Sequence, residues 1–180
     1  MPDAHRPSAR IAWLRVALVT AAVIVVDQLT KRWIADPIQP GQTRHILPGL
    51  QFVHTLNDGV AFGLAPGDDA LVLVLIGLAL GGVLVYFARH ATRSLVWLPT
   101  GLLIGGAMSN ILDRVRDGSV TDFIKLPLGW PPFNLADTAI TFGVIILAFI
   151  VEAQARRPAT AVEGPSRRSG WRRPRVGSPE

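Results

Sequence analysis

Four aspartates are the residues of this chain best placed to do chemistry. Asp27, Asp113 and Asp137 lie near the ends of apolar segments long enough to cross a membrane, and Asp122 lies in the connection between residues 113 and 132. A carboxylate at membrane depth is energetically costly, so such residues are functional candidates by default. The chain has no Cys, which excludes a cysteine nucleophile, a thiolate zinc site and a disulfide framework.

The spacing of these residues is compatible with three kinds of site. Asp27 and Lys31 are four residues apart and could form an ion pair on a helix surface, while Asp113 and Arg114 finish another helix. The carboxylate oxygens could instead bind a metal or other ion. Two of the carboxylates could also act as acid and base on a water molecule. Spacing alone does not decide between the three.

The elements that must position these aspartates are long and apolar. Of the 180 residues, 49% are hydrophobic and only 17% are charged, and the mean hydropathy is +0.36. Residues 70–88 and 94–112 are each 19 residues without a charge. As a helix such a stretch is roughly 28 Å long, close to the ~30 Å hydrocarbon core of a bilayer. Two further apolar segments are residues 11–34 and 133–151.

We therefore expect an all-α membrane protein with four transmembrane helices. The first segment also has the basic flank and apolar stretch of a secretory signal, but no A-x-A-like site follows it, so we interpret it as a retained helix. Residues 49–56, GLQFVHTL, are apolar and β-branched. They predict a small extracytoplasmic β element between helices one and two.

The distribution of basic residues predicts the orientation. Four crossings place both termini on one side, which carries 12 of the 18 Lys and Arg residues, and leave 6 on the other side. The positive-inside rule then places both termini in the cytoplasm and the four aspartates near the outer face. The domains are an N-tail (1–10), a four-helix membrane domain (11–154) and an Arg-rich, disordered cytoplasmic tail (155–180). The basic tail has one Trp and no fold around it, so we expect no nucleic-acid binding.

Four local sequence blocks narrow the choice of chemistry. They are DQLTKRW (27–33), NDGVAFG (57–63), GGAMSNILDRVRDGSVTDFI (105–124) and FNLADTAITFG (133–143). In this order they resemble lipoprotein signal peptidase (signal peptidase II), the aspartic peptidase of bacterial inner membranes. The resemblance covers about residues 11–152. The GG-A-x-x-N-x-x-DR-x-x-x-G-x-V-x-DF run followed by FN-x-AD is its most specific part.

The resemblance implies that Asp122 and Asp137 are the catalytic dyad. Two close carboxylates do not both ionise readily, so one keeps a proton while the other accepts one from water. The ionised Asp then activates the water that attacks the scissile carbonyl, and the protonated Asp polarises that carbonyl and helps protonate the leaving amine. The pair titrates as a unit, so the owner of the proton is not assigned.

The resemblance also implies a set of residues that bind substrate or support the dyad. Asn and Arg side chains can hold a peptide backbone or brace a carboxylate, and the Gly can permit close approach of substrate. The set comprises Asp27, Lys31, Asn57, Gly59, Asn110, Asp113, Arg114 and Asn134. For Asp27 with Lys31, a simple ion pair stays an alternative. Ser109 stands where the family more often has Gly, which predicts looser or reshaped packing near Asn110.

The implied substrate is a prolipoprotein whose Cys bears diacylglycerol, cleaved just before that Cys. The implied location is the bacterial cytoplasmic (inner) membrane, with membrane lipids as partners, and we expect a monomer. No metal and no organic cofactor are implied. Two alternatives come from other classes: a small cation or proton transporter that uses membrane carboxylates, and a non-catalytic membrane scaffold. Transport sites tend to lie near the bilayer midplane, whereas these acids gather at one face.

Overall fold

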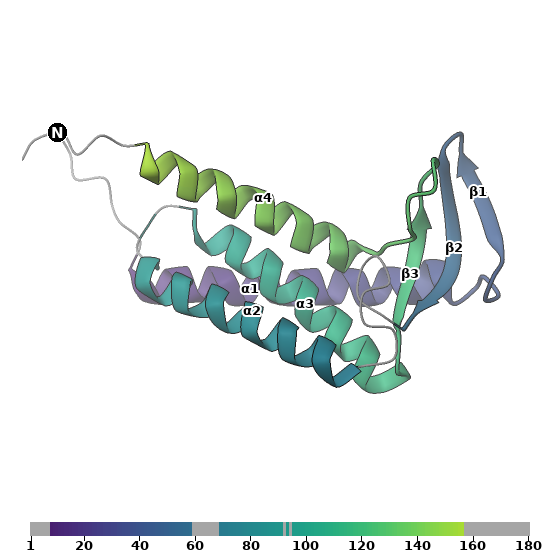
Figure 1. The fold of residues 1–180 in the computed structure, drawn as a ribbon, viewed down its shortest axis with the longest axis horizontal. Coiled ribbons are helices and arrows are strands. Elements are labelled where there is room, and N and C mark those ends of the chain that lie inside the picture. The colour runs from purple at the N-terminus through teal and green to yellow at the C-terminus, as the bar shows by residue number, and fades with distance from the viewer. Residues whose placement is uncertain (1–7, 59–68, 92, 94, 157–180) are drawn as a thin grey trace, which may run out of the picture.

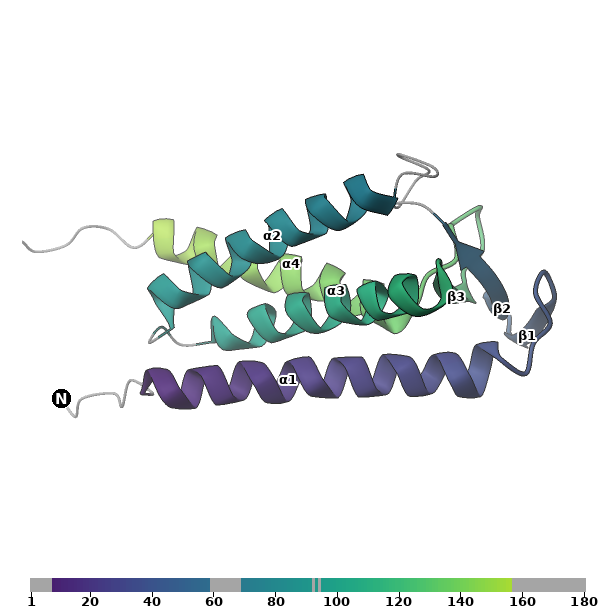
Figure 2. The same ribbon diagram turned by 90° about the horizontal axis from the view of Figure 1, so that it is seen from below.

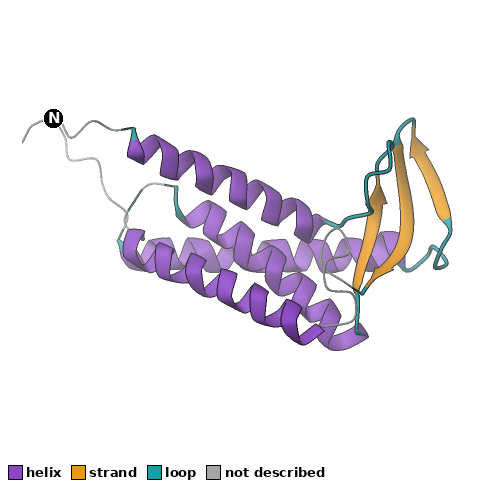
Figure 3. Cartoon of the chain, in the orientation of Figure 1, coloured by secondary structure: helices purple, strands orange, loops and turns teal. Residues whose placement is uncertain are grey.

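The computed structural model describes residues 8–58, 69–91, 93 and 95–156. Within them the chain forms helices that lie side by side and a small sheet at one end of the bundle (Figure 1, Figure 3). The helices are α1 (Ala9–Thr30) with its continuation η1 (Lys31–Ala35), α2 (Asp69–His90), α3 (Trp97–Asp117) and α4 (Leu135–Ala155). The strands are β1 (Thr43–Leu47), β2 (Leu50–Asn57) and β3 (Val120–Lys125).

Helix α3 is the centre of the bundle. It packs against α1, α4 and α2, as Figure 2 shows from below. Its close contacts are made by glycines: a Cβ on Gly105 would lie 2.7 Å from Cβ of Val23 on α1, and one on Gly106 would lie 2.5 Å from the Ala136 carbonyl oxygen on α4. Such distances are too short for real side chains, so only glycine permits these crossings. The sequence of α3 therefore sets how closely α1 and α4 approach it.

The sheet is built from two separate connections. Its strand order is β1-β2-β3, and both pairs are antiparallel. The expected strand between helices one and two is confirmed by β2. The sheet also contains β3, which lies in the connection between residues 113 and 132 and was not predicted as a strand. The β-branched residues of Val120–Lys125 were a strand signal that Asp122, in their midst, obscured. Thr55 of β2 is the register partner of Asp122.

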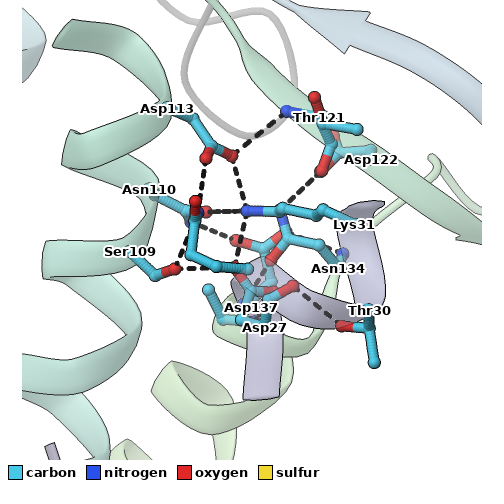
Figure 4. A network of polar contacts seen from close by, with 12 residues as sticks. Asp27, Thr30, Lys31, Ser109, Asn110, Asp113, Thr121, Asp122, Asn134 and Asp137 are labelled. Atoms are coloured by element: carbon cyan, nitrogen blue, oxygen red, sulfur yellow. Dashed lines mark hydrogen bonds and ion pairs between the residues drawn. The ribbon is translucent and has the colours of Figure 1, made fainter. Parts of the chain in front are cut away.

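Helix α3 extends further than the uncharged stretch predicted. It ends at Asp117, where Gly118 adopts a left-handed conformation (φ 76°) and donates its N–H to the Arg114 carbonyl. The expectation that Asp113 and Arg114 finish the helix is therefore wrong. Both lie inside its last turns, so the Asp113 side chain points across the bundle rather than away from a helix end (Figure 4).

Two helices are long and apolar enough to cross a membrane by length and composition: α1 with η1 (Ala9–Ala35) and α4. The part of α2 whose side chains are described, Val74–His90, is also apolar but shorter. Helix α3 carries several polar side chains and does not pass this test among the described helices. Two apolar helices are consistent with a membrane protein, while four crossings stay a prediction.

Replacing Gly106 tests the α3–α4 crossing. Gly106→Ala places a Cβ against the Ala136 backbone, so α4 must move away, and overpacking of this kind costs about 1–3 kcal/mol of stability. Gly82→Ala on α2 is the matched control because a Cβ there meets nothing within 4 Å, and it should be neutral or slightly stabilising. Thermal unfolding in detergent measures both. Equal melting temperatures for the two variants would contradict this account of the crossing.

Candidate active site

The site begins with an irregular turn that carries a lysine into the bundle. The Thr30 hydroxyl donates to the carbonyls of Val26 and Asp27, both at 2.8 Å, and the next five residues form a π turn. Within it the Asp36 N–H bonds the Lys31 carbonyl five residues back, at 3.2 Å. Wider turns of this kind are frequent at functional sites. Lys31 is only 5% exposed at its start, so its side chain lies inside the protein.

The Lys31 ammonium group joins two helices. It lies 2.7 Å from Asp27 Oδ2 on α1 and 2.6 Å from Asp113 Oδ2 on α3 (Figure 4). It also donates to Oδ1 of Asn110, at 3.3 Å. Breaking a buried pair leaves an uncompensated charge, which usually costs more than an exposed pair contributes. The predicted Asp27–Lys31 ion pair is therefore present, but Asp113 is a second partner that spacing along α1 did not reveal.

Each of these two carboxylates also holds the backbone beside one member of the predicted dyad. Asp27 Oδ1 accepts the N–H of Ala136, at 2.9 Å, and Ala136 precedes Asp137. Asp113 Oδ2 accepts the N–H of Thr121, at 3.4 Å, and Thr121 precedes Asp122. One ammonium group thus ties together the two carboxylates that fix α4 and β3 relative to each other.

Asn134 contacts both members of the predicted dyad. As N-cap of α4 it forms a capping box with Asp137: its Oδ1 accepts the Asp137 N–H at 2.9 Å, and its own N–H donates to Asp137 Oδ2 at 3.2 Å. Its Nδ2 donates to Asp122 Oδ1, at 2.7 Å. The remaining carboxylate oxygens accept from Asn110 (2.8 Å to Asp137 Oδ1) and Asn57 (3.0 Å to Asp122 Oδ2). Both carboxylates are therefore held in fixed orientations by amide groups.

Burial, and after it the neighbouring Asp137 carboxylate, raise the pKa of Asp122 from its ordinary value of 3.8 to about 7. The amide donors Asn57 and Asn134, and the Lys31 charge, act in the opposite direction but do not cancel the burial. Asp122 is 2% exposed, whereas Asp137 is half-buried. The site thus contains a carboxyl group that can hold a proton near neutral pH beside a second carboxylate that water can reach.

Most of the predicted site residues meet at this one end of the bundle. The structure brings together Asp27, Lys31, Asn57, Asn110, Asp113, Asp122, Asn134 and Asp137. Arg114 is half-buried in the last turns of α3, and its predicted role in bracing a carboxylate stays a prediction. Gly59 lies outside the described residues.

Two further polar residues belong to the network and were not among the predicted site residues. Ser109 Oγ donates to Asp27 Oδ2 at 2.7 Å, and Gln28 Nε2 donates to Asp113 Oδ1 at 2.6 Å and to Ser109 Oγ at 3.2 Å. Ser109 is fully buried and adds a hydrogen bond, while its predicted effect on packing near Asn110 stays a prediction. Gln28 could have been predicted from the sequence, because it is a polar residue in an apolar helix and directly follows Asp27.

Comparisons with known proteins show the family of this chain. The family model for signal peptidase (SPase) II matches residues 19–152. The chain belongs to the signal peptidase II family. A lipoprotein signal peptidase of Syntrophomonas wolfei is 38% identical over 136 residues, which are 75% of this chain and 91% of that protein. One of Moorella thermoacetica is 40% identical over 136 residues, covering 73% of this chain and 89% of the relative.

Solved structures agree with the family assignment. A bacterial membrane enzyme, 27% identical, superposes with a TM-score of 0.75 and covers 81% of this chain and 92% of its own. A second structure of a bacterial membrane enzyme, 29% identical, gives a TM-score of 0.69 over 76% of this chain and 91% of its own. As a member of the signal peptidase II family, the chain is an enzyme, a peptidase of the aspartic type.

The raised pKa of Asp122 predicts a dependence of stability on pH. The unfolded chain loses this proton near pH 3.8 and the folded chain near pH 7, so between these values folding takes up a proton. The free energy of unfolding therefore falls as pH rises from about 4 to about 7. Asp122→Asn lacks the titrating group, so its melting temperature should fall less than that of the wild type between pH 5 and pH 8.

Asp117→Asn is the control for this measurement. Asp117 is exposed at the end of α3, so its replacement should leave the pH dependence of the wild type unchanged. Thermal unfolding of the three proteins in one detergent at both pH values is sufficient. An Asp122→Asn curve that falls in parallel with the wild type would show that Asp122 does not hold the proton.

Proposed function

We propose that this member of the signal peptidase II family removes the signal peptide from prolipoproteins whose Cys bears diacylglycerol, and that it cleaves just before that Cys. Membership of the lipoprotein signal peptidase family supports the coarser part, action on lipoprotein precursors. The lipidated Cys and the position of the cut are proposed from that membership. The observation that supports an aspartic dyad is the contact of Asn134 with both carboxylates, because it holds Asp122 and Asp137 together in a buried site.

The proposed reaction uses Asp122 and Asp137 as one acid–base pair with a single proton between them. The ionised carboxylate accepts a proton from water while the water oxygen attacks the scissile carbonyl carbon. The protonated carboxyl donates a hydrogen bond to the carbonyl oxygen, which carries the developing negative charge. When the C–N bond breaks, the leaving nitrogen takes a proton from the pair and departs as the amine of the lipidated Cys. Both carboxyl groups then return to their starting state.

The geometry supports a division of roles within the pair. Asp122 is deeply buried and its pKa is near 7, so it favours the proton at neutral pH. Asp137 is half-buried and accepts two hydrogen bonds, from the Asn134 N–H and the Asn110 amide. Because Asp137 is the more exposed of the two, we propose that the water molecule enters on its side. The proton belongs to the coupled pair, and this division describes its resting state.

The proposed membrane placement puts the dyad at the outer face of the bacterial inner membrane. Four helices cross, with both termini in the cytoplasm. The start of α1 and the end of α4 lie at one end of the bundle and the sheet at the other (Figures 1 and 2), which an even number of crossings requires. The 12-to-6 division of Lys and Arg supports the cytoplasmic assignment of the termini. We propose that the membrane domain (11–154) acts as a monomer among membrane lipids.

This placement fits the substrate. A signal peptide helix lies in the bilayer, and its lipidated Cys sits at the interface, where the carboxylates of the first turn of α4 and of β3 also lie. Burial of acyl chains contributes about 0.8 kcal/mol per CH₂ to binding. A transport site near the bilayer midplane, the alternative, is not favoured because the buried carboxylates contact the first turn of α4 and β3, at the end of the bundle that carries the sheet. Residues 157–180 of the predicted tail lie outside the described residues.

Replacing either member of the dyad should abolish cleavage. Asn has the size of Asp but cannot accept the proton of water or return it to the leaving amine. Asp122→Asn and Asp137→Asn should each reduce kcat by at least ~10²–10⁴, and the double variant should be little worse than either, because both act through one proton. Mass spectrometry of a diacylglyceryl-modified prolipoprotein incubated with the purified protein in detergent measures the product.

The same assay tests a dependence of cleavage on pH. The cleavage activity of the wild type should fall as pH rises above about 7, because Asp122 then loses its proton.

Two controls keep this result interpretable. Asp117→Asn changes an exposed carboxyl on α3 and should cleave like the wild type. Asp113→Asn weakens the bracing of β3 and should reduce activity less completely than the dyad variants. Wild-type turnover in either dyad variant, or loss of activity in EDTA that a divalent ion restores, would contradict the aspartic mechanism.

Reporter fusions test the proposed topology. Fusions after Asp58 and Asp117 should report an extracytoplasmic location, and fusions after Arg93 and Arg156 a cytoplasmic one, because the positive-inside rule places the Arg-rich connections inside. Paired alkaline phosphatase and fluorescent-protein fusions give opposite signals at each position. A cytoplasmic Asp117 would separate the dyad from the outer face and would refute the placement.

A further inference from the structure

The turn that follows β3 contains an unusually placed leucine. Leu128 and Gly129 both have positive φ, at 66° and 75°, the pattern of a type I′ turn. Asn, Asp and Gly suit these positions, whereas a leucine there is strained. The side chain of Leu128 is also completely exposed, at 102%. Leu128 therefore combines a strained backbone conformation with a fully exposed apolar side chain, and an Asn at this position would avoid both.

Other exposed apolar side chains surround this turn. They come from the turn itself and from the end of β1, and a Cβ on Gly49 would lie 3.7 Å from Pro127, so the two turns lie against each other. We define the apolar tip as Ile46, Leu47, Leu126, Leu128 and Trp130, all exposed. Pro127 and Pro131 flank the second turn and restrict its backbone, so the tip is presented in a preformed shape.

The apolar tip lies beside the first turn of α4, where a membrane boundary is expected in the proposed orientation. The strands run across the end of the helix bundle, and the end of the sheet at which β1 turns into β2 reaches past the first turn of α4 (Figure 1). Helices α1 and α4 are the two that are long and apolar enough to span a bilayer. The tip therefore overhangs the bundle, and in the membrane orientation proposed above it lies at the level where those helices leave the hydrocarbon. Trp and basic residues are typical of that level. The tip contains the exposed Trp130, and the exposed Lys125 directly precedes Leu126 of the tip.

We propose that the apolar tip inserts into the outer leaflet of the membrane, at the boundary between headgroups and acyl chains. Lipid covers Leu128 and Trp130, while the Lys125 ammonium group reaches the phosphates. The insertion fixes the height of the sheet, and with it Asp122 on β3, relative to the bilayer surface. This inference rests on the membrane orientation given under Proposed function but not on the peptidase chemistry.

The absence of Cys from the chain allows a direct test. Leu128→Cys carries a nitroxide spin label, and the full-length protein is placed in vesicles of phosphatidylethanolamine and phosphatidylglycerol. We expect the label to collide more with oxygen than with a water-soluble nickel chelate, as lipid-exposed sites do. A label on Arg44→Cys, at an exposed position of β1 outside the apolar tip, should show the reverse.

A second pair of variants separates insertion from turn stability. In a protein labelled at Leu126→Cys, Leu128→Asn should move the label toward water, while the melting temperature in detergent stays equal or rises because Asn suits the positive φ. Leu95→Asn is the matched control. Leu95 is also exposed and has a positive φ (68°), but it lies in the connection between α2 and α3, at the other end of the bundle. It should leave the label unchanged.

Three results would overturn the proposal. The first is a label at position 128 that is exposed mainly to the nickel chelate, which places the tip in water. The second is spin–spin broadening that grows with the protein-to-lipid ratio, which shows that a second copy of the chain covers the tip. The third is an unchanged label in the Leu128→Asn background. All three results come from spin-label measurements that do not need cleavage of a substrate. The cleavage assay therefore tests the peptidase assignment separately.

Discussion

One buried ammonium group holds the polar end of this bundle together. Lys31 faces two carboxylates, Asp27 and Asp113, so the cluster carries an excess negative charge in a place from which water is largely excluded. Backbone N–H groups offset that charge: the first turn of α4 donates to Asp27 through Ala136, and β3 donates to Asp113 through Thr121. Removing one partner of such a buried cluster costs about 3–5 kcal/mol. The cluster gives α1, α3, α4 and β3 a single relative position.

That position matters because the two predicted catalytic carboxylates come from unlike elements. Asp137 lies in the first turn of a helix and accepts a backbone N–H, whereas Asp122 lies on a strand and accepts only side-chain amides. Asn134 is the N-cap of α4 and the donor to Asp122, so the residue that starts the helix also sets the distance to the strand. Glycines bring the helices close enough for these short side chains to meet, above all Gly106 at the α3–α4 crossing.

The sequence predicted the helical fold and most of the cluster, because apolar length and the family-like blocks are local features. It did not predict β3, because a charged residue, Asp122, interrupts the apolar strand pattern. Only the folded structure shows that Asp122 is buried there and bonded to Asn57 and Asn134. It also did not predict that Asp113 pairs with Lys31, because their separation along the chain is 82 residues. The hydrogen bond from Ser109 to Asp27 was not predicted either, because the two residues lie on different helices. Contacts between helices were beyond sequence reasoning for the same reason.

Strand β3 lies at the edge of the sheet, and its other side faces away from β2. An edge strand normally offers free N–H and C=O groups to an incoming strand. Here the Thr121 N–H bonds Asp113, the Thr121 carbonyl accepts from Asn134, and Phe123 and Ile124 donate to the Phe133 carbonyl. Over these residues the edge beside Asp122 is already occupied by the protein itself. Addition of a peptide strand at this edge would first have to break these bonds, so the edge offers no ready-made backbone groups over these residues.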